Sequence, residues 1–130
     1  WDAIRLLHAE RIDHGVRAAE DPELLRYLAD TQIPLGVCPR SNVVLGLYDD
    51  WIDHPLVALR DAGVNVTINT DDPAPLGTTL EADWAVCAET FELTEDDLVG
   101  FARASIAASF ADDATKRVLT ATLPSPATSR

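Results

Sequence analysis

The sequence has 130 residues, 47% hydrophobic and 25% charged, which is typical of one globular domain. Ten Lys and Arg stand against 22 Asp and Glu, and a net charge of -12 argues against binding to a nucleic-acid polymer or an anionic membrane. No apolar run approaches the roughly 20 residues of a membrane span, and no signal region opens the chain. Two cysteines are too few for a disulfide framework, so we expect a cytoplasmic protein.

The first predicted element is a helix. Residues 1–9 place Ile4 and Leu7 on one helical face, with polar residues opposite. No Ser, Thr, Asp or Asn precedes this helix as a cap, so we expect the sequence to belong to a longer chain.

The remaining elements alternate between strand and helix before an all-helical ending. Three apolar or β-branched segments predict strands: 11–16, 33–38 and 64–69. Cap and stop residues predict helices over 20–28, from 53 to a stop at Gly63, over 80–91, over 98–110 after a cap at residues 94–97, and over 112–121. A polar loop is predicted between the second strand and the helix that opens at residue 53, and the tail at 123–130 is predicted to be disordered.

The order of strand, helix, strand, helix, strand, helix predicts a parallel α/β sheet. Three parallel strands leave both edges unpaired, whereas a closed barrel takes eight. We therefore interpret residues 1–122 as a C-terminal piece of a larger α/β barrel of the TIM (β/α)8 kind. A complete three-stranded α/β domain is the alternative. In the barrel interpretation, Val64, Val66 and Ile68 or their alternates are uncovered, which favours association.

Polar residues gather where the predicted strands end, and α/β proteins place their sites at that edge. His14 follows the first strand, residues 38–42 the second and residues 70–73 the third. Adjacent Asp71 and Asp72 repel each other unless a cation or a proton donor separates their roles. A metal ion could bind one and leave the other for substrate, and the alternative is that they cap a turn.

The histidines and cysteines have structural alternatives too. His14 either acts in proton transfer beside a metal or is a hydrogen-bonded structural residue. His8 is predicted to be a residue of the first helix's surface, and His54, at the start of a helix before Pro55, is predicted to be structural. Cys38 and Cys87 are predicted to be buried small apolar residues rather than nucleophiles. No glycine motif predicts a phosphate cradle.

Four blocks, taken together and in order, resemble the adenosine deaminase family. The blocks are Arg11-Ile12-Asp13-His14-Gly15, Val37-Cys38-Pro39-Arg40-Ser41-Asn42, His54-Pro55-Leu56 and Asn69-Thr70-Asp71-Asp72-Pro73. The all-helical ending agrees as well, and the resemblance runs from about Glu10 to about Leu119. It implies a (β/α)8 barrel with one catalytic zinc, of which this chain supplies the last three strands and the closing helices.

The resemblance implies a role for each of three residues. Asp71 is the expected zinc ligand, and Asp72 is expected to bind the imidazole-side nitrogen of the purine. His14 is the expected catalytic residue, which hydrogen-bonds the attacking hydroxide and stabilises the oxyanion. Zinc lowers the pKa of its water toward about 7, which makes hydroxide available near neutral pH. The implied reaction is hydrolytic deamination of a 6-aminopurine, in which hydroxide attacks C6 and ammonia leaves.

The family pattern is incomplete in this sequence. The family's His-x-His pair and His-Ala-Gly-Glu block supply the other zinc ligands and a glutamate that protonates the ring, and neither has a match here. A catalytic zinc site needs about three protein ligands. We therefore expect that residues 1–130 alone neither hold stoichiometric zinc nor deaminate, and that activity needs the N-terminal barrel portion or self-association.

The substrate signals conflict. Residues 69–73 and 77–80 resemble the adenosine branch of the family, whereas Asp13 resembles the adenine branch. We expect adenosine, which would give inosine and ammonia, ahead of adenine, which would give hypoxanthine, and other 6-aminopurine nucleosides third. A non-catalytic binding module derived from the barrel is the competing class of function.

Overall fold

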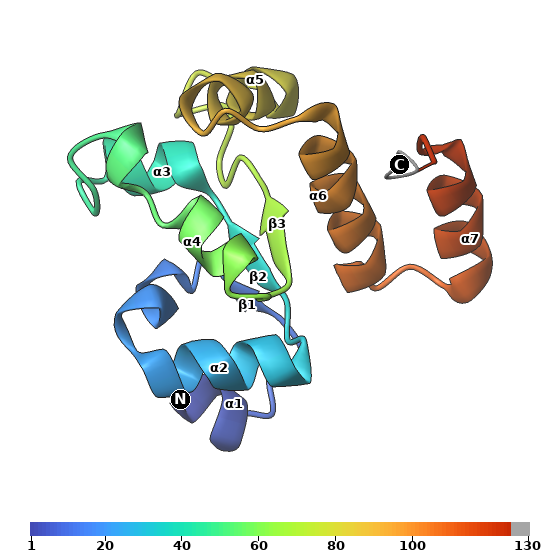
Figure 1. The fold of residues 1–130 in the computed structure, drawn as a ribbon, viewed down its shortest axis with the longest axis horizontal. Coiled ribbons are helices and arrows are strands. Elements are labelled where there is room, and N and C mark those ends of the chain that lie inside the picture. Colours follow the sequence, from blue (N-terminus) through green and yellow to red (C-terminus); the bar gives the residue numbers. More distant parts are fainter. Residues whose placement is uncertain (126–130) are drawn as a thin grey trace, which may run out of the picture.

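The computed structural model describes residues 1–125, and its elements alternate as Figure 1 shows. In chain order they are α1 (Asp2–Arg5), β1 (Ile12–Asp13), η1 (Val16–Glu20), α2 (Pro22–Thr31), β2 (Leu35–Val37), α3 (Pro39–Val44), η2 (Trp51–Asp53), α4 (Leu56–Asp61), β3 (Val66–Ile68), α5 (Leu80–Thr90), α6 (Glu95–Ala108) and α7 (Asp113–Thr122), where η marks a 3-10 helix.

The three strands form one parallel sheet in the order β1-β2-β3. Ile12 pairs with Leu35, and Leu35 pairs in turn with Val66. The predicted parallel α/β arrangement is confirmed, with strands shorter than the apolar segments suggested. β1 ends at Asp13 because Gly15 turns the chain with φ 68°, at a point where a Cβ atom would lie 2.8 Å from Cδ2 of Leu35.

The apolar core surrounds β2 and β3. Every residue of these two strands is buried, as expected for parallel strands that are covered on both faces. Leu28 of α2 and Leu56 and Leu59 of α4 complete this core, each at most 2% exposed. α4 and α6 both pack against β3 and lie on either side of it in Figure 1.

The expectation that barrel-side residues are uncovered is wrong for the three residues named. Val64, Val66 and Ile68 are only 5%, 3% and 2% exposed. Their side chains are covered because the flanking helices close over β3 within this chain. Thr67, which lies between Val66 and Ile68, is 4% exposed as well.

Side-chain caps begin the helices at several predicted positions. Asp21 accepts hydrogen bonds from the backbone N–H groups of Glu23 and Leu24, and Asp112 accepts one from Thr115. Thr94 forms a reciprocal capping box with Asp97 at the start of α6, within the cap predicted at residues 94–97. Each such cap contributes about 1 kcal/mol. After α4, Gly63 has φ 84°, the left-handed stop that its position predicted.

Two elements differ from the sequence-based expectation. α1 ends at Arg5 rather than at residue 9, so Leu7 is 76% exposed and His8 lies outside the helix with φ 53°. The segment after β2, predicted as a polar loop, contains α3 and η2. Pro39 ends the strand and also occupies the first turn of α3, where its missing N–H removes no helical hydrogen bond.

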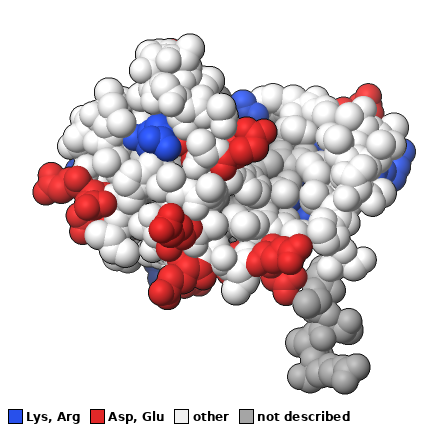
Figure 2. All heavy atoms as spheres, turned by 90° about the horizontal axis from the view of Figure 1, so that it is seen from above, with Lys and Arg blue, Asp and Glu red and all other residues white. Residues whose placement is uncertain are grey.

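The surface of the protein is rich in acidic side chains. On the face shown in Figure 2, acidic side chains dominate over basic ones, in keeping with the net charge of -12. Among residues 1–125, no helix has the length and apolar character that crossing a membrane requires. The tail predicted to be disordered, residues 123–130, falls mostly on residues 126–130, which lie outside the described residues. The disorder of this tail and the domain assignment of residues 1–122 stay predictions.

The packing around β3 makes a stability prediction. Leu59→Ala empties a fully buried site and should lower the free energy of unfolding by about 2–5 kcal/mol, measured by urea unfolding. Leu45→Ala makes the same chemical change at a side chain that is 75% exposed and should stay within about 0.5 kcal/mol. Equal losses in the two variants would contradict the described core.

Candidate active site

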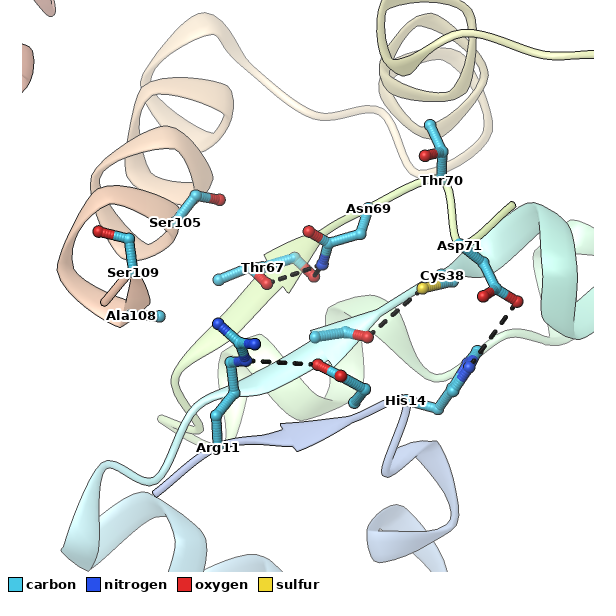
Figure 3. Close-up of a pocket in the computed structure, with 12 residues that line it drawn as sticks. Arg11, His14, Cys38, Thr67, Asn69, Thr70, Asp71, Ser105, Ala108 and Ser109 are labelled. Carbon is cyan, nitrogen blue, oxygen red and sulfur yellow. Dashed lines mark hydrogen bonds and ion pairs between the residues drawn. The ribbon is translucent and has the colours of Figure 1, made fainter. Parts of the chain in front are cut away.

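A cavity of about 440 Å³ opens beside the sheet, where the chain leaves the carboxyl ends of the strands and faces α6 (Figure 3). This size lies within the range of small-molecule sites, about 300–1,000 Å³. Its walls come from all three strands, from the residues that follow them and from α6: Arg11, Asp13, His14, Gly36, Cys38, Thr67, Asn69, Thr70, Asp71, Ser105, Ala108 and Ser109. Two of the three residues singled out from the sequence, His14 and Asp71, line it.

His14 and Asp71 point toward each other at one side of the cavity (Figure 3). Nε2 of His14 lies 3.8 Å from Oδ2 of Asp71, and the two side chains are 38% and 39% exposed. The strand-end position predicted from the sequence therefore brings a histidine and a carboxylate from distant segments into one site.

The backbone is unusual at both residues. His14 has φ 61° and Asp71 has φ 65°, in the left-handed region that costs a non-glycine residue about 1–3 kcal/mol. Asp and His tolerate this region better than most side chains do. The turn after each strand thereby directs the side chain into the cavity, and the rest of the fold supplies the free energy that holds it there.

The first turn of α3 contacts both residues. The Ser41 hydroxyl donates a hydrogen bond to Oδ2 of Asp71 at 2.6 Å. Nδ2 of Asn42 lies 3.2 Å from Nδ1 of His14. Ser41 and Asn42 are 1% and 4% exposed, so water competes little for these contacts. Sequence analysis predicted that Ser41 and Asn42 follow the end of a strand but predicted no role for them. Their position after a strand was the one signal that could have marked them as site residues.

A buried ion pair fixes α3 against α5. Nε of Arg40 donates to Oδ1 of Asp83, which is fully buried, and the Thr78 hydroxyl donates to the same oxygen at 2.6 Å. The Arg40 guanidinium also lies over the Trp51 ring, 5.4 Å from its centroid. These contacts set the position of α3, and through it the positions of the residues that Ser41 and Asn42 hold.

His54 contacts Asn42 and is not among the residues that line the cavity. It is 4% exposed; its Nε2 lies 3.0 Å from Oδ1 of Asn42, and its Nδ1 accepts the backbone N–H of Leu56 at 3.2 Å. The rings of Tyr48 and Phe91 flank it at centroid distances of 5.1 and 6.5 Å. Burial lowers the pKa of His54 to about 4, so it is neutral at pH 7. His54 is therefore a buried, hydrogen-bonded residue, in keeping with the structural role predicted for it.

The two cysteines are buried thiols, as predicted. Cys38 is 5% exposed and Cys87 is fully buried, and both are free. Burial raises the pKa of each thiol to about 12, and the nearby Asp71 carboxylate adds to this for Cys38. Neither cysteine is therefore a thiolate nucleophile at neutral pH, although Cys38 lines the cavity.

Asp72 and the metal-binding capacity of the chain differ from what the sequence implied for a complete site. Asp72 is exposed and is not among the residues that line the cavity, so its predicted contact with substrate stays a prediction. Within residues 1–125, no three His, Cys, Asp or Glu side chains are grouped to hold a metal ion. Asp71 can contribute one carboxylate ligand, and the contacts that Ser41 and His14 make with it are both to its Oδ2. The donor chemistry thus fits part of a zinc site and not a whole one.

Comparison with known proteins agrees with this geometry. The family model described as adenosine deaminase matches residues 1–125, and the chain belongs to the adenosine deaminase family. Its sequence is 43% identical over 122 residues to an adenine deaminase of Rhizobium leguminosarum, covering 94% of this chain and 38% of that protein. It is 47% identical over 116 residues to an aminodeoxyfutalosine deaminase of Streptomyces avermitilis, covering 89% of this chain and 32% of that protein.

Solved structures of similar proteins share the fold. An adenine deaminase from Arthrobacter aurescens superposes with a TM-score of 0.90 at 41% identity, over 92% of this chain and 37% of that one. An amidohydrolase from Burkholderia ambifaria, solved with bound Zn, gives 0.83 at 31% identity, over 93% and 34%. The chain therefore spans only about a third of the length of these relatives.

The buried His54 makes stability depend on pH. An unfolded His54 binds a proton near pH 6.5, whereas the folded one binds it only near about pH 4. The stability contribution of the neutral ring is therefore complete above about pH 6.5 and is lost as the pH falls toward about 4, by at most about 3 kcal/mol.

Urea unfolding of the parent and of His54→Gln, at about pH 7 and about pH 4.5, measures this contribution. The loss on acidification should be smaller in the variant, because glutamine does not titrate. Carboxylates titrate alike in both proteins, so they cancel in the comparison. An identical loss in the two proteins would show that His54 is not held neutral.

Proposed function

We propose that this chain is part of a zinc-dependent deaminase that hydrolyses a 6-aminopurine, with adenine as its first substrate. The reaction converts adenine and water into hypoxanthine and ammonia. The three parallel strands would be the last three of a (β/α)8 barrel, and the final helices would close it. The structural likeness to the Arthrobacter adenine deaminase, with a TM-score of 0.90, supports this barrel assignment.

One observation carries the proposal. A histidine and an aspartate from the ends of two strands meet at 3.8 Å in a cavity of purine-compatible size, within a chain of the deaminase family. Both side chains are set by turns of high backbone energy and by buried hydrogen bonds. Arrangements of this kind concentrate at functional sites.

Each residue would have a distinct role. Asp71 would be one zinc ligand, and Ser41 would fix its carboxylate by occupying Oδ2. His14 would hydrogen-bond the attacking oxygen and stabilise the negative charge that develops on it. Asp72 would bind the imidazole-side nitrogen of the purine. Zinc, when bound, supplies a Lewis acid that makes hydroxide available near neutral pH.

The preference for adenine reverses the order expected from the sequence, in which adenosine came first. The Rhizobium relative and the Arthrobacter structure are both named adenine deaminase. Asp13, the residue that resembled the adenine branch, lines the cavity. Gly36 leaves room for its carboxylate, because a Cβ atom at that position would lie only 2.7 Å from Oδ1 of Asp13. The Streptomyces relative makes aminodeoxyfutalosine the second substrate to test.

The rest of the zinc site and of the barrel would come from other residues, either from an N-terminal portion or from a partner chain. We propose a small-molecule purine as the ligand, with neither nucleic acid nor a membrane as a partner. Two free, buried cysteines suit the reducing conditions of the cytoplasm, which is the location we propose. The retained pair of His14 and Asp71 favours this enzyme over a non-catalytic binding module.

Metal analysis and turnover assays test the proposal. The 130-residue chain alone should bind less than one zinc and release no ammonia from adenine or adenosine, because one ligand does not hold the ion. A longer form that carries His-x-His and His-Ala-Gly-Glu segments should bind one zinc and deaminate adenine with the larger kcat/KM. Stoichiometric zinc and turnover in the isolated chain would contradict the partial-site proposal, and an inactive zinc-loaded longer form would contradict the enzyme.

Aspartate-to-asparagine variants of the active form separate the assigned roles. Asp71→Asn should lower kcat by at least about 100-fold and reduce the zinc content. Asp72→Asn should act mainly on KM, because its role is to bind the base. Asp30→Asn, at an exposed carboxylate of α2, is the matched control and should leave both parameters unchanged. Full activity of Asp71→Asn would exclude Asp71 as the ligand.

A further inference from the structure

We infer that Asn42 and His54 are positioning residues that fix the ring tautomer of His14, so that its Nε2 carries the hydrogen. The inference follows from a chain of hydrogen bonds that starts at a backbone amide and ends in the cavity. The effect of this tautomer on catalysis rests on the proposed function. The tautomer itself can be measured without an activity assay.

This series of hydrogen bonds starts at Leu56, the first residue of α4. The backbone N–H of Leu56 can only donate, and it points at Nδ1 of His54 at 3.2 Å. Nδ1 of His54 is therefore the acceptor and carries no hydrogen. Because burial keeps this ring neutral at pH 7, with a pKa of about 4, its single ring hydrogen must be on Nε2.

The next link sets the orientation of the Asn42 amide. Nε2–H of His54 faces Asn42 at 3.0 Å and needs an acceptor, which only the amide oxygen provides. The amide NH2 group is thereby turned to the opposite side. A flipped amide would set its NH2 against the Nε2–H of His54 and leave buried donors without acceptors. The backbone of α4 thus decides which way Asn42 points.

The last link reaches His14. Nδ2 of Asn42 donates to Nδ1 of His14 at 3.2 Å, so this nitrogen is the acceptor. In the neutral ring, the hydrogen must then be on Nε2, the nitrogen that lies 3.8 Å from Oδ2 of Asp71 (Figure 3). His14 therefore presents a hydrogen-bond donor to the cavity, which is the form needed to stabilise an oxygen that gains negative charge.

Burial makes the relay effective. Asn42 and His54 are each 4% exposed, and the rings of Tyr48 and Phe91 flank His54. Water therefore has little access to the Asn42 and His54 ends of these links. An Asn42 side chain exposed to solvent would impose no such preference on His14.

The test reverses the polarity of one link. In Asn42→Asp, a carboxylate still accepts the Nε2–H of His54 but can no longer donate to His14, so Nδ1 of His14 should gain a hydrogen. Nitrogen-15 NMR of histidine-labelled, metal-free protein distinguishes protonated from bare ring nitrogens. The chain has three histidines, and the His54→Gln variant identifies the signals of His54.

His54 also reports whether the variant is folded. The inference is supported if Nδ1 of His14 is bare in the parent and protonated in Asn42→Asp while His54 keeps its native tautomer. It is overturned if His14 is unchanged under those conditions, or if the parent carries the hydrogen on Nδ1. If Asn42→Asp fails to fold, Asn42→Ala decides, because His14 should then show a mixture of tautomers, and an unchanged single tautomer rejects the inference.

Kinetics of the active form add a separate readout. Asn42→Asp should lower kcat by about 10- to 100-fold and leave KM for the purine nearly unchanged, because the base contacts are not altered. A reversed tautomer with unchanged kcat would reject the catalytic meaning of the relay. A reversed tautomer in a protein that has no deaminase activity at all would reject the proposed function and leave the relay intact.

Discussion

The first turn of α3 is the constraint on which the site depends. Its consecutive residues Arg40, Ser41 and Asn42 bind three different parts of the chain: α5, the turn after β3 and the turn after β1. Each contact involves a charged or polar group from which water is largely excluded, so none of the three partners can be removed without leaving another unsatisfied. A six-residue helix, too short to be stable alone, is thus held by its contacts and in turn positions His14 and Asp71.

The general position of the site followed from the sequence. Polar residues after predicted parallel strands meet at one edge of a sheet, and His14 and Asp71 do meet there. The helix starts at Asp21, Thr94 and Asp112 could be predicted as well, because a capping side chain binds backbone N–H groups only two or three residues further along the chain.

The contacts that hold the site could not be predicted from the sequence. Ser41 and Asn42 bind partners 30 and 28 residues away, and such pairs depend on how whole elements pack. α3 itself was missed because Pro39 signals the end of a strand as strongly as the start of a helix. The early end of α1 has the same kind of cause, because the left-handed turn at His8 leaves no mark in hydrophobic periodicity.

The left-handed backbone at His14 and Asp71 bears on attempts to make the protein more robust. Glycine is the substitution that would relieve such torsional cost, but at these positions it would delete the groups that face the cavity. Glycine substitution at either position to raise thermal stability would therefore lower the activity that these side chains support. Gains should instead be sought at sites such as Leu6 and Val44, whose apolar side chains are exposed and have no part in the cavity.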